Sequence, residues 1–304
     1  MKIAFLGNFS VPYSTESHHK LTWERMGHEV VALQEGRAAT DQFLAAAEGA
    51  QLVQITHTHG WPFSGSMTPD EMMLRLRDKK IPTMSYHLDY YWGLNQWDRR
   101  EERIGRTWDW RVDYFFSTDG SHDEEFKERG VNHVYLPPAV VETGCYEGVP
   151  QAQYSSPVGF TGSVIYHPEY PFRQALVEGL TVAYKNRFKT FHGVREGALN
   201  DLYASVKVVA GDHVFAGRPR YWSDRVPEVC GRGGFLVHPR TEGLDIPVAT
   251  YEPQSVDSLV GRIDYYLSHD AERESLRKEC HEYVKNNHTY RHRLDKILQV
   301  MGLA

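Results

Sequence analysis

The stretch YWSDRVPEVCGRGGFLVHPRTEGLD, residues 221–245, carries the densest pattern in the chain and decides the fold of the region around it. Ser223 or Asp224 is placed to cap a short helix that runs through Glu228. The glycines of GRGG then permit a tight turn into the apolar strand FLV, and a loop with TEG follows. The stretch therefore predicts a helix, a glycine turn and a strand in close succession.

The same stretch combines groups that favour anions. Exposed N–H groups at a helix N-terminus and guanidinium donors both suit a diphosphate. Arg225 and Glu228 lie three positions apart and so share one face of the predicted helix. The first can hold phosphate while the second accepts hydrogen bonds from ribose hydroxyls. A helix with a surface salt pair explains the same pattern, and the residues leave both interpretations open.

Outward from this stretch, both halves of the chain alternate apolar runs with amphipathic runs, which is the pattern of strand, crossover helix and parallel strand. In the second half we expect strands at 158–160, 188–192, 206–210 and 234–237, and helices at 171–183, 199–205, 224–231, 255–268, 271–285 and 291–301. In the first half we expect strands at 2–7, 27–33, 50–56, 81–86, 112–117 and within 131–140, and helices at 16–26, 71–79 and 122–129.

The segment 142–157 is rich in Gly, Pro, Gln and Ser without clear periodicity, and it is the best candidate linker. We therefore expect two Rossmann-like, doubly wound α/β domains, at 1–150 and 151–304, with terminal helices that can pack back on the first domain. Ligands of such sheets bind at the carboxyl ends of the strands. Two domains of this kind predict a ligand in a cleft between them.

Composition narrows the class of protein. A length of 304 residues suits two domains. Hydrophobic residues make up 41% and charged residues 24%, as in a globular chain. The net charge of -6 is mild, so the whole chain is not an obvious partner for a polyanion.

Cysteine usage and hydropathy predict a cytoplasmic protein without a membrane span. Cys145, Cys230 and Cys280 are too few and too widely spaced for a disulfide framework. The N-terminal run MKIAFLGNF lacks the apolar core of a signal peptide. No window approaches the roughly 18 apolar residues that a membrane helix needs.

The first half offers three candidates for proton transfer. Its first loop, GNFSVPY at 7–13, lacks the GxGxxG pattern, which disfavours a dehydrogenase. His18 lies at the start of the next predicted helix, where an imidazole can act as a general base. His87 and Asp89, in SYHLDYYWGL, follow the fourth predicted strand at its carboxyl edge. The alternatives are that His18 and His19 are surface imidazoles beside helix-capping hydroxyls, and that Asp89 is an N-cap aspartate on a loop.

Two further histidines have the spacing of paired metal ligands. His57 and His59, in ITHTHGW, lie two positions apart and would face the same side of a strand. No Cys, Asp or Glu stands beside them in the sequence to complete a ligand set. We therefore expect no metal there and treat both histidines as lining or packing residues.

Several motifs of the second half follow one another in a fixed order. Arg225 and Glu228 precede GRGGFLVHP at 231–239, TEGL follows at 241–244, and HTYRHR lies at 288–293. This order resembles that of glycosyltransferases of the GT-B fold, and more closely the CgeB-like group.

The resemblance extends upstream and becomes looser in the first half. VGFTGS at 158–163 with Arg173 is similar to the first strand and glycine turn of the family's second domain, and SVKVVAGDH at 205–213 to its next strand. In the first half it is carried by YHLD at 86–89 and VDYFFSTDG at 112–120.

The resemblance implies a donor site for a nucleotide sugar, with UDP the expected nucleotide and no separate cofactor. Glu228 would bind the donor ribose, and Arg225 and Arg218 are candidates to stabilise the leaving diphosphate. Members of the fold generally need no metal, and the chain has no Asp-x-Asp motif. The expected donor-site residues are Gly162, Ser163, Arg173, Asp212, Arg218, Ser223, Arg225, Glu228, Gly233 and Gly234.

One position departs from the family's pattern. Many retaining members carry a second Glu eight residues before Glu228, where this chain has Arg220. The departure leaves open whether the reaction retains or inverts configuration. The resemblance implies transfer of a sugar to an unidentified acceptor, with a spore or surface polysaccharide expected and a hydroxylated base in phage DNA as an alternative. A nucleotide-sugar 2-epimerase and a non-catalytic nucleotide or glycan binder remain as other classes.

Overall fold

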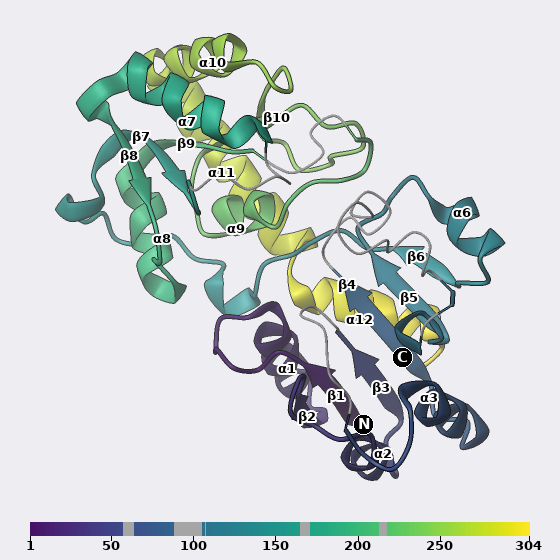
Figure 1. Ribbon diagram of the computed structural model, residues 1–304. Helices are drawn as coiled ribbons and strands as arrows, with labels where there is room; N and C mark the ends of the chain where they lie inside the picture. Colours follow the sequence, from purple (N-terminus) through teal and green to yellow (C-terminus); the bar gives the residue numbers. More distant parts are fainter. Residues whose placement is uncertain (57–63, 88–104, 107, 165–170, 213–217) are drawn as a thin grey trace. The chain divides into compact units, whose positions relative to one another are not determined.

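The computed structural model describes residues 1–304 except 57–63, 88–104, 107, 165–170 and 213–217. The chain divides into two compact units. The first contains Met1–Pro137 and the C-terminal residues Arg293–Ala304, and the second contains Pro138–His292. Each unit is a parallel sheet with its own helices (Figure 1).

The first unit contains six parallel strands in the order β2-β1-β3-β4-β5-β6. Its elements in chain order are β1 (Lys2–Gly7), α1 (Thr15–Arg25), β2 (Glu29–Gln34), α2 (Thr40–Ala47), β3 (Leu52–Ile55), α3 (Pro69–Asp78), β4 (Thr83–His87), the 3-10 helix η1 (Trp108–Trp110), β5 (Tyr114–Ser117), α6 (Asp123–Glu128) and β6 (His133–Tyr135).

Neighbouring residues of each strand supply the two faces of this sheet. In β1, Ile3 belongs to a core cluster with Trp23 of α1, whereas Ala4 belongs to a separate cluster with Phe43 of α2. This follows from the two-residue period of a strand, which sends neighbouring side chains to opposite faces. Because both faces are covered by helices, the strands are apolar on both sides, as expected for a parallel sheet.

The last helix, α12 (Tyr290–Met301), completes the core of the first unit. Leu294, Ile297 and Leu298 follow the spacing of one helix face and pack in the cluster that contains Trp23. Nε of Arg293 donates to the carbonyl oxygen of Pro137 at 2.7 Å. The end of the chain is thereby fixed to the end of the first unit's continuous segment.

The second unit contains five parallel strands in the order β11-β10-β9-β7-β8. Its elements are η2 (Glu142–Gly144), η3 (Ala152–Tyr154), β7 (Ser156–Thr161), α7 (Pro171–Tyr184), η4 (Lys185–Arg187), β8 (Phe188–Phe191), α8 (Glu196–Ser205), β9 (Val206–Ala210), α9 (Arg225–Gly231), β10 (Leu236–Pro239), β11 (Ala249–Tyr251), α10 (Val256–Ser268) and α11 (Asp270–Asn287).

The division between the units lies at Pro137 and Pro138, whereas the sequence placed a boundary near 150. The intervening residues pack on the second unit. Nδ2 of Asn200, in α8, donates to the carbonyl oxygens of Gly144 and Tyr146 at 2.8 and 2.6 Å. A segment without periodicity is ordered here because a buried amide satisfies its carbonyls, a contact that local composition does not reveal.

The helix α2, the strand β11 and the 3-10 helices η1 to η4 were not expected from the sequence, and the remaining described elements match the expected ones in type and order. No described helix has the length and apolar character needed to cross a membrane. All three cysteines are free thiols.

Candidate functional site

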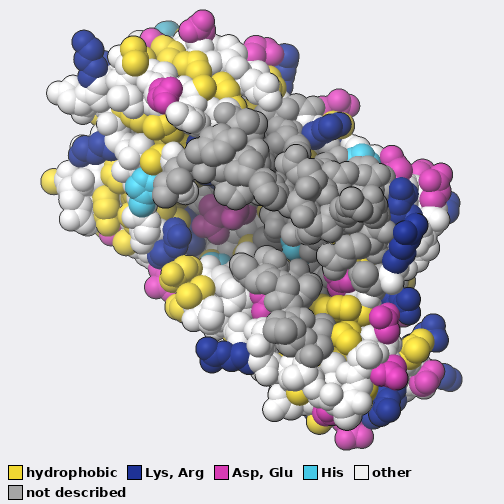
Figure 2. Space-filling view, in the orientation of Figure 1, with side chains coloured by type: hydrophobic (Ala, Val, Ile, Leu, Met, Phe, Trp, Pro, Cys, Tyr) yellow, Lys and Arg dark blue, Asp and Glu magenta, His cyan; other side chains and the backbone are white. Residues whose placement is uncertain are grey.

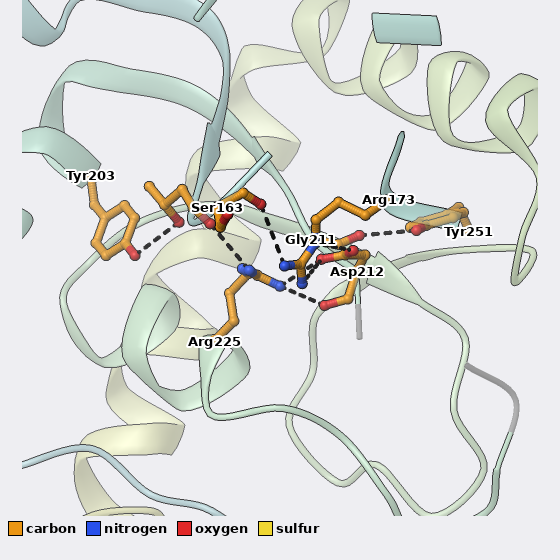
Figure 3. Close-up of polar contacts among 8 residues, drawn as sticks. Ser163, Arg173, Tyr203, Gly211, Asp212, Arg225 and Tyr251 are labelled. Atoms are coloured by element: carbon orange, nitrogen blue, oxygen red, sulfur yellow. Dashed lines mark hydrogen bonds and ion pairs between the residues drawn. The ribbon is translucent and has the colours of Figure 1, made fainter. Parts of the chain in front are cut away.

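Two arginines and one aspartate form a buried ion cluster in the second unit (Figure 3). Nε of Arg173 donates to Oδ2 of Asp212 at 2.8 Å, and Nη2 donates to Oδ1 at 3.2 Å. Nη1 of Arg225 donates to the same Oδ1 at 2.8 Å and to the Asp212 carbonyl oxygen at 2.5 Å. The three side chains are 10%, 13% and 4% exposed, in the order Arg173, Arg225, Asp212.

The fold brings these residues together from three separate segments. Asp212 follows β9, Arg173 lies in the first turn of α7, and Arg225 begins α9. In a doubly wound domain the carboxyl ends of the strands and the N-termini of the following helices meet at one edge. The cluster therefore occupies the edge at which such domains bind ligands.

The end of β7 supplies the backbone of the same site. Nη2 of Arg225 donates to the carbonyl oxygen of Thr161 at 3.1 Å. Gly162 has a φ of 129°, and a Cβ there would lie 3.1 Å from Nη2 of Arg225. A glycine is required because this backbone conformation disfavours other residues and the guanidinium lies so close. The neighbouring carbonyl of Ser163 accepts a 3.4 Å hydrogen bond from Nη1 of Arg173.

The cluster carries an excess positive charge. The three side chains of the cluster, two guanidinium groups and one carboxylate, sum to a formal charge of +1. The ring of Phe160 lies beneath both arginines, with its centroid 5.7 Å from Cζ of Arg173 and 5.1 Å from Cζ of Arg225. An excess cation held rigidly at a helix N-terminus attracts a diphosphate.

Glu228 lies one turn further along α9 than Arg225 and belongs to a second ion pair. Its Oε2 accepts from Nε of Arg232 at 2.6 Å, and Nη1 of Arg232 also donates to Oδ1 of Asn200 at 2.6 Å. Burial raises the pKa of the Glu228 carboxyl, and the attraction of Arg232 offsets only part of this effect. Within the described chain, Oε1 of Glu228 has no hydrogen bond to a side chain, so it can accept from a ligand hydroxyl.

The remaining expected donor-site residues lie at other places in the second unit. Gly233 and Gly234 follow the far end of α9 from Arg225 and lead into the amino end of β10. A Cβ on Gly234 would lie 2.8 Å from Cγ1 of Val229, so this glycine permits close packing of helix and strand. Arg218 is exposed on the segment between β9 and α9.

The predicted side-chain cap of α9 was wrong. Asp224 occupies the N-cap position in a helical conformation and makes no capping hydrogen bond. Oγ of Ser223 is buried without a hydrogen-bond partner among the described residues. The first turn is instead held by Arg225, whose side chain reaches the ends of β7 and β9.

In the first unit, His18 is half-buried in α1 and His87 is buried at the end of β4. Asp89 lies outside the described residues, as do His57 and His59. The next residue, His19, is buried and is therefore not a surface imidazole. Its ring stacks on that of Tyr86, with ring centroids 4.9 Å apart. Burial lowers the pKa of His19 to about 3, so its imidazole is neutral.

Sequence reasoning did not select several buried polar groups at the carboxyl edge of this first sheet. A polar residue directly after a buried strand is the signal that marks them, as in STD after YFF at 114–116. Besides His87, which the sequence did select, the buried polar residues near the ends of β1 to β5 are Glu16, Glu35, Thr56, Thr118 and Asp119. No group of three or more His, Cys, Asp or Glu among the described residues has the arrangement of a metal site.

The two parallel sheets with flanking helices define the GT-B class of fold, and solved structures match the chain over its whole length. A sucrose-phosphate synthase from Thermosynechococcus elongatus matches with a TM-score of 0.69 at 10% identity, covering 100% of both chains. The HepE protein of Anabaena, in complex with UDP and glucose, matches with a TM-score of 0.68 at 10% identity, covering 99% of this chain and 100% of that one. The predicted fold class is confirmed.

A family model described as glycosyl transferase-like matches residues 164–299, which include Arg173, Asp212, Arg225 and Glu228. An alpha-glucosyltransferase in complex with UDP and a 13-mer DNA containing a HMU base has a TM-score of 0.62 at 10% identity, with 99% of each chain covered. No curated protein sequence matches this chain. The resemblance to the CgeB-like group stays a prediction.

Proposed function

We propose that the protein is a glycosyltransferase whose second unit binds a nucleoside diphosphate sugar, with UDP the expected nucleotide. The observation that carries the proposal is the cluster of Arg173, Asp212 and Arg225 at the carboxyl ends of β7 and β9. It lies inside the region that matches the glycosyl transferase-like family. Two of the similar structures contain UDP, which supports this choice of nucleotide.

In this proposal two charged groups bind different parts of the donor. The excess positive charge of the cluster suits the diphosphate, which gains negative charge as the bond to the sugar breaks. Oε1 of Glu228 suits the ribose, because a carboxylate accepts hydrogen bonds from two neighbouring hydroxyls. In this proposal the arginines supply the charge stabilisation that a divalent cation supplies in other enzymes.

Titration calorimetry with UDP, UMP and uridine, in buffer containing EDTA, tests the donor site. We expect UDP to bind about tenfold or more tighter than UMP, the equivalent of one charge-assisted hydrogen bond. Addition of Mg²⁺ should leave the affinity unchanged. Binding that appears only with Mg²⁺ or Mn²⁺ would overturn the metal-free proposal, and equal affinities for UDP and uridine would exclude a diphosphate site.

For the acceptor we propose a hydroxyl group of a polysaccharide, with a hydroxylated DNA base as the second candidate. The alpha-glucosyltransferase of similar fold is in complex with DNA. On the face shown in Figure 2, Lys and Arg side chains are interspersed with Asp and Glu side chains, and the net charge is -6. Such a charge distribution favours a neutral or weakly charged acceptor over a polyanion.

Product analysis separates the alternative functions. A transferase incubated with a UDP-sugar releases UDP and, slowly, free sugar, because water replaces the missing acceptor. A 2-epimerase converts the donor into its 2-epimer, and a binding protein leaves it intact. We therefore expect chromatography to show UDP release that increases when the true acceptor is added.

A further inference from the structure

Four side chains of the first unit form a continuous chain of hydrogen bonds beside the carboxyl end of β5. Oγ of Ser117 donates to Oδ2 of Asp119 at 2.5 Å and lies 2.9 Å from Nε2 of His133. Nδ1 of His133 lies 2.7 Å from Oδ1 of Asp123. These residues come from the end of β5, the loop after it, the start of β6 and the first turn of α6.

This chain of hydrogen bonds runs from the interior of the unit to solvent. Ser117 and Asp119 are fully buried, and the His133 side chain is also 0% exposed. Asp123, at the other end, has a side chain that is 49% exposed. The His133 ring is fixed in orientation because it stacks on Phe126, with ring centroids 4.3 Å apart and planes at 20°.

The number of protons in these hydrogen bonds determines the charge of the four side chains. Three hydrogen bonds join the four side chains, and each needs one proton. Ser117 supplies one, and a neutral imidazole supplies one. Since the Ser117 hydroxyl proton is directed to Asp119, both nitrogens of His133 must donate, one to Ser117 and one to Asp123. His133 is then an imidazolium between two carboxylates.

We infer that Asp119, Ser117, His133 and Asp123 form a proton relay that links the carboxyl edge of the first sheet to solvent. The inference rests on the proposed glycosyl transfer, which releases a proton. In the structure the third proton sits on His133, which leaves Asp119 as a carboxylate, and this proton can move transiently through Ser117 to make Asp119 an acid. Both arrangements satisfy all three hydrogen bonds, so exchange between them leaves no buried group unpaired.

The relay accounts for the proton that the proposed reaction releases. The acceptor O–H bond breaks, a bond forms from that oxygen to the sugar carbon, and the diphosphate leaves with the electron pair of the broken C–O bond. Asp119, which is a carboxylate while His133 is an imidazolium, takes the proton released at this edge, and His133 then passes the proton on its Nδ1 through Asp123 to water. Ser117, His133 and Asp123 are positioning residues in this scheme, because they act through Asp119.

His122 and His87 lie on elements that neighbour the four hydrogen-bonded side chains. On α6, Nδ1 of His122 lies 3.4 Å from Oε1 of Glu125. On β4, His87 is the register neighbour of Ser117, which places this candidate catalytic residue directly beside the relay. The acids that the structure shows hydrogen-bonded along the chain are Asp119 and Asp123.

Nitrogen NMR of the His133 ring tests the relay without an activity assay. We expect both ring nitrogens to carry protons at pH 7.5, about one unit above the reference pKa of a histidine. Asp123→Asn keeps an oxygen acceptor but removes the charge, and it should lower the titration midpoint of the ring by about one unit or more. Glu124→Gln is the matched control, because it removes the same charge from the same helical turn without touching His133.

A double-mutant comparison tests whether Asp119 and His133 are coupled through Ser117. Asp119→Asn should shift the titration of His133 in the wild-type background and much less in a Ser117→Ala background. A ring with one proton at pH 7.5, or equal shifts in Asp123→Asn and Glu124→Gln, would overturn the relay. Equal shifts of Asp119→Asn in both backgrounds would also overturn it.

Transfer assays give the second readout. Asp123→Asn should move the pH dependence of kcat while leaving UDP affinity unchanged, and Glu124→Gln should change neither. An unmoved pH dependence of kcat in Asp123→Asn contradicts the relay. If the wild-type protein transfers sugar to no acceptor, the proposed function fails, whereas the NMR titrations still decide whether the proton chain exists.

Discussion

Arg225 reaches from the first turn of α9 to Asp212 at the end of β9, with Nη1 2.8 Å from Oδ1 and 2.5 Å from the carbonyl oxygen of the same residue. One guanidinium therefore ties together a helix start and a strand end. The other side of the carboxylate is held by Arg173. Asp212 thus fixes the positions of two cations that would otherwise repel each other.

Arg225→Lys should weaken UDP binding by about tenfold or more, because an ammonium cannot reproduce the planar set of contacts made by a guanidinium. The positive charge is kept, so a loss of affinity reports the loss of the guanidinium's hydrogen-bond geometry. Titration calorimetry gives the affinity. Arg240→Lys is the matched control, since Arg240 forms an exposed pair with Glu252 at 2.7 Å in the same unit. Equal affinities for the two variants would remove Arg225 from the donor site.

Glu228→Ala should weaken UDP binding by about 1 to 3 kcal/mol, the scale for hydrogen bonds to a charged group. It also leaves Arg232 buried without its carboxylate partner, so a loss of stability is expected. Glu228→Gln keeps an oxygen for Arg232 and should fold more readily while still losing affinity. Glu252→Ala serves as the control in an exposed pair. A folded Glu228→Gln variant with wild-type affinity places the ribose elsewhere.

Acid should destabilise the first unit through His19. Its folded-state pKa of about 3 lies below the ordinary value of 6.5, so between these limits the unfolded chain binds a proton that the folded chain does not. Stability therefore falls as the pH drops below 6.5, by up to about 1.4 kcal/mol per pH unit from this group. His19→Phe keeps a ring beside Tyr86 and should flatten this part of the pH profile.

Thermal unfolding of wild-type and His19→Phe proteins between pH 4.5 and 7.5 measures the difference. His269→Gln is the control, because that imidazole is exposed at the end of α10. Parallel profiles for the wild-type and His19→Phe proteins would contradict the assignment of acid sensitivity to His19.

Asp89→Asn should reduce transfer by about a hundredfold or more while leaving UDP affinity intact, because a positioned general base contributes at least that much. The proposal for Asp89 comes from its place after the fourth strand in the sequence. His87→Ala and His18→Ala belong in the same series, measured by initial rates of UDP release with acceptor. An Asp89→Asn enzyme that retains more than about a tenth of the wild-type rate shows that the base lies elsewhere.

The sequence by itself determined the two α/β units and most of their elements, because strand and helix periods are local patterns. It also singled out Gly162, Arg173, Asp212 and Arg225, which the fold brings into one cluster. It selected Gly233 and Gly234 for the same site; in the structure a Cβ on Gly234 would meet Val229 of α9, and a Cβ on Gly233 would meet Glu147. A glycine motif specifies a turn, but the motif does not reveal what approaches that turn.

Only the tertiary structure decided which charges meet. Asp212 and Arg173 are 39 residues apart, and Ser117 and His133 are 16 apart, so no local pattern predicts that each pair is in contact. The sequence allowed terminal helices to pack back on the first domain without saying which one does, and in the structure α12 packs in the core of the first unit after the chain has completed the second. Local propensity sets the elements, whereas burial of apolar faces and pairing of buried charges set the partners, and these partners are distant in sequence.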